Sequence, residues 1–123
     1  MVNAEKVTMN LNNISNIALF RLFVEQGENE AISLFFQNQS DLFYRVAHKY
    51  TKNSADAEDV LQSAFMLITE KAYQYKGLHL DEEKLLQSWC LSIVVHCALK
   101  KIQNELNRKR KESNYSNTKI FQE

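Results

Sequence analysis

Side chains suited to binding a partner cluster in residues 54–70. Apolar residues recur there at intervals of three and four, which predicts one buried helical stripe. The stripe consists of Ala57, Val60, Leu61, Ala64, Phe65 and Ile68. A polar set lies off the stripe and is expected to face outward, with Asp56 in the first turn, where the helix dipole favours negative charge. It consists of Asp56, Asp59, Gln62, Ser63 and Met66.

This outward set has two interpretations. A carboxylate and an amide beside an apolar group suit a protein surface that offers arginine and leucine side chains. The simpler alternative is a solvated helix face without any partner.

A second group of candidate residues lies in the basic C-terminal part. Residues 100–123 contain 7 Lys or Arg and 3 Asp or Glu, whereas residues 1–99 contain 8 and 12. Cations and amides alternate on one helical face, and such faces position phosphates and contact base edges. A soluble helix end whose cations complement the helix dipole is the simpler alternative. The candidates for nucleic-acid contact here are Lys100, Lys101, Asn104, Asn107 and Arg108, together with His96, one turn before Lys100.

Aromatic residues flank a loop predicted at residues 76–82. Tyr73 and Tyr75 precede it, Lys76 is its first residue and Trp89 follows it. Such aromatics are usually core or rim residues, and Trp89 is expected in the core. One tyrosine could instead stack on an unpaired base, which needs no particular base identity. Gly77 would give the loop its conformational freedom.

Catalytic and metal chemistry find no support in the sequence. The three histidines and two cysteines lack the spacing of metal ligands. There is no glycine-rich phosphate loop, nucleophile elbow or acid pair, so neither an enzyme nor a cofactor is expected. Cys90 and Cys97 are separated on one predicted helix by about 10.5 Å, which is too far for a disulfide.

The chain has no proline and two glycines, which favours long helices. We expect an all-α, compact bundle of three principal helices plus a short N-terminal helix. The short helix is capped by Ser15 or Asn16 and closed by Gly27. The principal helices cover about 29–51, from a cap at Asn53 or Ser54 to about Tyr73 or Tyr75, and from a cap at Asp81 to about Lys111.

These helices predict three segments along the chain. Residues 1–14 form a flexible N-terminal arm, residues 15–112 the helical domain, and residues 113–123 a tail or the start of a linker. No apolar run is long enough to span a bilayer, and the N-terminus lacks a signal-peptide pattern. A cytoplasmic protein without membrane contact is therefore expected.

From about Leu22 to Glu112 the chain resembles the sigma factors of bacterial RNA polymerase, in region 2 of the extracytoplasmic-function branch. Four segments match in the family's order. DAEDVLQSAF at 56–65 is close to the family's most recognisable string. The others are residues 25–31, residues 47–53 and the segment from Trp89 to Ile93 followed by a basic helix end.

The resemblance implies two binding events and no catalysis. The helix carrying Asp59 and Gln62 would dock on the clamp coiled coil of the largest polymerase subunit. Residues 73–84 and the helix from Trp89 to Arg110 would engage the promoter −10 element as a melted, single-stranded non-template strand. An anti-sigma factor would be a further partner, and the family's second domain would follow a linker after residue 113.

Three positions depart from the family pattern. Ser63 replaces an acidic residue, and His96 and Lys100 stand where the family usually has Asn and Asp. The resemblance thus supports polymerase binding better than a particular base specificity. The alternative is a helical interaction module that binds a protein regulator and does not touch DNA.

Overall fold

The computed structural model describes residues 11–122, with side chains described as far as Asn114 except that of residue 12. Within this range every regular element is helical, which confirms the all-α bundle. The α-helices are α2 (Asn16–Gln26), α3 (Asn29–Thr51), α4 (Ser54–Lys71) and α5 (Glu83–Gln122). Three short 3-10 helices are η1 (Leu11–Asn13), η2 (Ala72–Gln74) and η3 (Leu78–Leu80).

Local chemistry explains where the first helices begin and end. Ser15 caps α2 because its side-chain oxygen accepts a hydrogen bond from the backbone N–H of Ala18, at 3.3 Å. Gly27 ends α2 in the left-handed conformation, with φ of 69°. The Asn53 side chain accepts from the backbone N–H of Asp56 at 2.9 Å and so caps α4. The predicted bounds of α2 and α3 and the start of α4 are confirmed.

Two predicted bounds of α5 were wrong. Asp81 does not cap it, because this residue has φ of 54° and its carboxylate pairs with Arg21 at 3.1 Å. The helix begins at Glu83 and continues to Gln122, well past the predicted end near Lys111. Asn and Ser in this stretch have modest helix propensity, but no glycine or proline interrupts it.

At the other end of the chain, structure begins before the predicted start at Ser15. Leu11 is in the core, with 5% of its surface exposed. The remainder of the predicted N-terminal arm, residues 1–10, lies outside the described residues.

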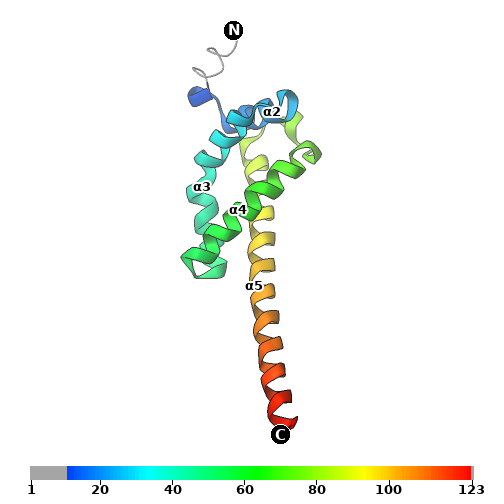
Figure 1. Cartoon of the computed structure of the whole chain (residues 1–123). Coiled ribbons are helices and arrows are strands. Elements are labelled where there is room, and N and C mark those ends of the chain that lie inside the picture. Colours follow the sequence, from blue (N-terminus) through cyan, green and yellow to red (C-terminus); the bar gives the residue numbers. More distant parts are fainter. Residues whose placement is uncertain (1–10, 123) are drawn as a thin grey trace.

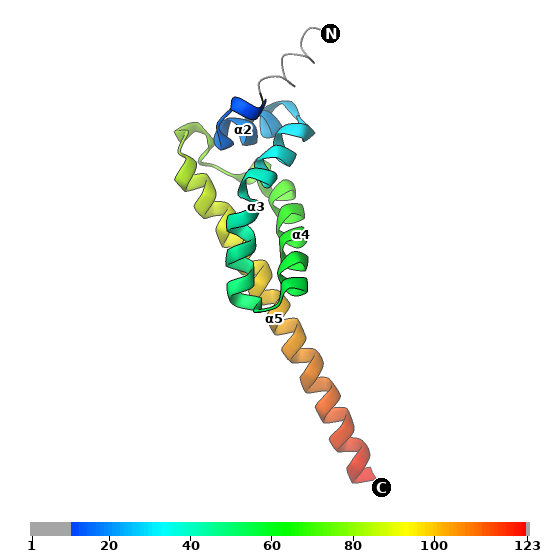
Figure 2. The same ribbon diagram turned by 90° about the vertical axis from the view of Figure 1, so that its left-hand side faces the viewer.

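α3 is the central helix, because it packs against α2, α4 and α5. α3 and α4 run side by side, joined by a short turn, while α2 lies across one end of the bundle (Figure 2). α5 packs against the same pair and then projects far beyond them toward the C-terminus (Figure 1). One end of the bundle is thus covered by α2, and the other is extended by a single helix.

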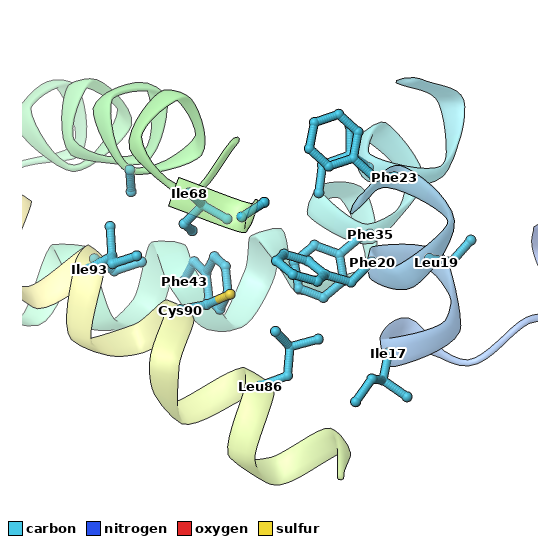
Figure 3. Packing of buried hydrophobic residues seen from close by; sticks show 14 of the residues in the cluster. Ile17, Leu19, Phe20, Phe23, Phe35, Phe43, Ile68, Leu86, Cys90 and Ile93 are labelled. Atoms are coloured by element: carbon cyan, nitrogen blue, oxygen red, sulfur yellow. The ribbon is translucent and has the colours of Figure 1, made fainter. Parts of the chain in front are cut away.

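Each helix contributes its apolar stripe to one core. The predicted stripe of α4 is confirmed, with Ala57, Val60, Ala64 and Ile68 buried and the remaining two members half-buried. Phe20 of α2 and Phe35 of α3 meet edge to face, with ring centroids 5.5 Å apart (Figure 3). Burying such a ring contributes about 1.5–3 kcal/mol, so this packing fixes how the helices lie against one another.

The Glu83–Asn114 part of α5 is long and apolar enough to span a membrane, contrary to the expectation from the sequence. Its most apolar window has a mean hydropathy of 1.2, and 33% of that window is buried inside the bundle. Core helices of soluble proteins meet the same criterion, so this is weak evidence for a membrane.

Candidate functional site: a groove between α4 and α5

An open groove of about 570 Å³ runs between α4 and α5. The α4 wall includes four of the predicted protein-docking residues: Asp59, Gln62, Ser63 and Met66. The α5 wall includes four of the predicted nucleic-acid residues: His96, Lys100, Lys101 and Asn104. Residues assigned from the sequence to two different partners therefore face one hollow.

The α4 wall is exposed, as the sequence predicted. Asp59, Gln62 and Ser63 are exposed, and Met66 keeps 66% of its surface accessible. The helix places them together because they recur at intervals of three and four residues, off the buried stripe. This wall offers a carboxylate, an amide and a hydroxyl around a soft apolar side chain.

The α5 wall carries the opposite charge. Lys100, His96 and Asn104 are exposed, whereas Lys101 is half-buried. Two lysines and one amide, Asn104, line this wall, whereas Asn107 of the predicted face lies outside the groove.

An ion pair crosses between the two helices. The Lys101 ammonium lies 3.3 Å from a carboxylate oxygen of Asp59 and 3.9 Å from one of Asp56. Asp56 itself is half-buried and does not line the groove, so it contributes to this surface only through Lys101. One predicted nucleic-acid residue is therefore held by two predicted protein-docking residues.

Sequence reasoning missed some residues of the groove. Glu70 and Leu67 extend the α4 wall and Cys97 lies on the α5 wall. Glu70 follows Met66 by four residues, so extending the outward face by one turn would have found it. Cys97 is half-buried.

Both cysteines are free, as their spacing predicted. Burial raises the pKa of the Cys90 thiol from 9.0 to about 12. Burial also raises the pKa of Cys97, against the opposing effect of the Lys100 and Lys71 charges. Neither thiol is activated as a nucleophile at neutral pH.

The predicted aromatic candidates separate into packed and exposed residues. Tyr75 and Trp89 are half-buried, with ring centroids 5.1 Å apart, and both meet the Phe20 ring edge to face. Both rings pack against the core without being fully buried, so Trp89 lies at the edge of the core and not inside it, and Tyr75 lies beside it. Tyr73 keeps 62% of its surface exposed beside Phe23, and Lys76 is also exposed.

Gly77 has a different role from the one expected. Its φ is −89°, so no left-handed conformation requires a glycine here. A Cβ at this position would lie 2.7 Å from Cζ of Tyr75, and the Tyr75 hydroxyl would be closer still. This hydroxyl is buried without a hydrogen-bond partner within the described residues, and burial is the main cause that raises the pKa of Tyr75. A glycine is needed at position 77 because any larger side chain would collide with the Tyr75 ring.

The remaining two candidates lie beyond the groove on α5. Arg108 pairs with Glu105 at 3.1 Å and with Glu112 at 2.8 Å along its own helix. These contacts raise the pKa of Arg108, and Arg108 lowers that of Glu105. The Asn107 side chain accepts a hydrogen bond from Gln103. The candidates thus form three groups: the aromatic end beside α2, the groove, and the projecting helix.

Among the described residues, no group of three or more His, Cys, Asp or Glu side chains is arranged to hold a metal ion. No family model matches the chain, and no match is found among curated proteins or solved structures.

Proposed function

We propose that this chain is a cytoplasmic sigma-factor domain that binds core RNA polymerase and captures the promoter −10 element as a single strand. The observation that carries the proposal is the groove itself. Its acidic and amide wall on α4 is in the position that the resemblance gives to polymerase docking. Its cationic and amide wall on α5 is in the position that the resemblance gives to promoter contact.

The chemistry of each wall suits its proposed partner. Asp59 accepts charge-assisted hydrogen bonds from arginine, and Met66 supplies an apolar contact that adapts to different shapes. On the other wall, lysines neutralise phosphates while Asn104 and His96 offer groups for base edges. Tyr73 supplies an exposed ring on which an unpaired base could stack.

Polymerase binding is tested with a paired substitution on the α4 wall. Asp59→Ala with Gln62→Ala should weaken binding of the domain to purified core polymerase about tenfold or more, because the carboxylate and the amide of the wall are lost. Glu58→Ala is the matched control, since Glu58 is an exposed neighbour on α4 that does not line the groove. Unchanged binding of the double variant would contradict the proposal.

Promoter binding is tested with a labelled −10-like single strand and the same sequence as a duplex, each at two salt concentrations. The domain should prefer the single strand, and affinity should fall as salt rises because counterions are released. Lys100→Ala should reduce the slope of log affinity against log salt by about 0.7, the value for one phosphate contact on a single strand. Lys49→Ala, an exposed lysine on α3, is the control.

A protein-interaction module without DNA binding is the second candidate. The observation that favours it is the neutralisation of cations on α5: Lys101 is paired with carboxylates of α4, and Arg108 with glutamates of α5. Such a module would bind a protein partner through the α4 wall. It would show neither the single-strand preference nor the steep salt dependence.

A further inference from the structure

Lys101 stands between two hollows of the surface. It lines the groove between α4 and α5, and it also lines a second hollow of about 260 Å³ beside Tyr50, Ile102 and Leu106. Its side chain is 30% exposed, against 60% for Asp59 and 35% for Asp56. The ammonium is thus partly enclosed at the point where the two helices meet, and its partners come from the facing helix.

The neighbouring lysine behaves differently. Lys100 lines the same groove and is exposed, and no ion pair of Lys100 is found within the described residues. Successive residues of an α-helix point about 100° apart, which is why one lysine reaches α4 while the next faces solvent. The chain therefore provides two adjacent cations, one free and one held.

We infer that Lys101 links the two binding events of the proposed function. In the free domain its ammonium occupies Asp56 and Asp59, the carboxylates that a cationic protein partner would take. When that partner docks on α4, it displaces Lys101, which becomes available to a phosphate of the nucleic acid. Binding of one partner thus favours binding of the other.

The coupling between the two binding events cannot exceed the free energy of the ion pair between Lys101 and the two carboxylates. Exposed salt bridges are weak, so releasing Lys101 should change an affinity by up to about fivefold. Coupling of two ligands is reciprocal, so the same factor applies to the protein partner and to the nucleic acid. This inference rests on the proposed function, because it requires that the two walls of the groove bind different partners.

The protein side is tested with the two lysines. Lys101→Gln should tighten binding to core polymerase by up to about fivefold, since Asp56 and Asp59 are then free. Lys100→Gln removes the same charge from the next residue and should not tighten binding. Equal effects of the two variants would overturn the inference, because they would reflect net charge alone.

The nucleic-acid side is tested without polymerase. Asp56→Asn with Asp59→Asn frees Lys101, and should tighten binding of a labelled single strand more than Asp41→Asn with Glu58→Gln. Both pairs remove two exposed or half-buried negative charges, but only the first pair contacts Lys101. The excess should be up to about fivefold and should disappear when Lys101→Gln is added. An excess that persists would show that Lys101 is not the link.

The outcomes separate the two ideas. If the wild-type domain binds both polymerase and the single strand but the matched variants behave alike, the link through Lys101 fails and the proposed function stands. If the wild-type domain binds neither, both are overturned. If it binds polymerase alone, the interaction module is the better description and the link has no second ligand.

Discussion

The aromatic end of the bundle, formed by Phe20, Tyr75 and Trp89, is held by apolar packing, whereas the groove between α4 and α5 is lined largely by polar and charged groups. At the aromatic end, Phe20, Tyr75 and Trp89 meet from three segments of the chain and pack ring against ring. In the groove, polar and charged side chains stay exposed, and the contact between helices at its surface is an ion pair. The first region holds the fold together with apolar area, whereas the second leaves its polar groups available to a partner.

This difference means that substitutions in the groove can change partner binding without changing the stability of the fold. Apolar burial contributes kilocalories per side chain, whereas exposed ion pairs contribute about 0–1 kcal/mol. The exposed polar residues of the groove can therefore be substituted with little effect on stability. Truncating a ring of the aromatic end, by contrast, should loosen the loop that leads into α5.

The largest effect is expected from truncating Phe20. Phe20→Ala removes edge contacts with Phe35, Tyr75 and Trp89 and should lower the free energy of unfolding by about 3–5 kcal/mol. Urea unfolding followed by circular dichroism measures it. Met66→Ala in the groove is the counterpart and should stay within about 0.5 kcal/mol. If the two variants lost similar amounts of unfolding free energy, the aromatic end would not be more important for stability than the groove.

An intermediate effect is expected at the loop. Gly77→Ala should lower the free energy of unfolding by about 1–3 kcal/mol, because the added methyl displaces the Tyr75 ring. Tyr75→Phe alone should cost little, since the hydroxyl it removes has no partner among the described residues. Combined with Gly77→Ala, it should recover part of the loss.

Gly27→Ala is the control for this pair. At Gly27 a Cβ would meet nothing within 4 Å, but φ is 69°. Its cost, about 1–2 kcal/mol, comes from the left-handed backbone. Tyr75→Phe should not reduce it, and a reduction would argue against a steric cause at Gly77.

At neutral pH the smallest effect is expected from the buried Cys90 thiol, which changes the free energy of unfolding only at alkaline pH. Cys90 has its pKa raised from 9.0 to about 12, so the unfolded chain loses this proton first. Stability should be unaffected below about pH 9 and should then fall by about 1.4 kcal/mol per pH unit as pH approaches 12. Urea unfolding at several alkaline pH values measures the slope.

Cys90→Ala is the variant that isolates this thiol. It should lose the share of the slope that begins near pH 9, whatever its effect at neutral pH. The loss that begins above pH 10 from Tyr75 should be reduced but not abolished, because burial is the largest cause that raises the pKa of Tyr75 and the charge of Cys90 is a smaller one. The same slope in both proteins would mean that Cys90 is not the group responsible.

Most of the helical architecture could be predicted from the sequence, because caps and apolar periods act within a few residues. Ser15, Gly27 and Asn53 mark helix ends by local hydrogen bonds or backbone conformation, and the stripe from Ala57 to Ile68 marks the buried face. The prediction that Asp81 caps α5 was wrong, because its carboxylate instead accepts a hydrogen bond from Arg21, 60 positions away in the sequence. Competition from a distant partner is not visible in a local pattern.

The sequence by itself determined the helices, the outward face of α4 and the alternation of cations and amides on α5. Only the tertiary structure decided that these two faces line one groove and that Lys101 meets Asp59 across 42 positions of the chain. It also decided that Tyr75 and Trp89 pack on Phe20 and leave Tyr73 exposed. Periodicity fixes which side of a helix is buried, whereas the packing of helices against one another fixes what each exposed side faces.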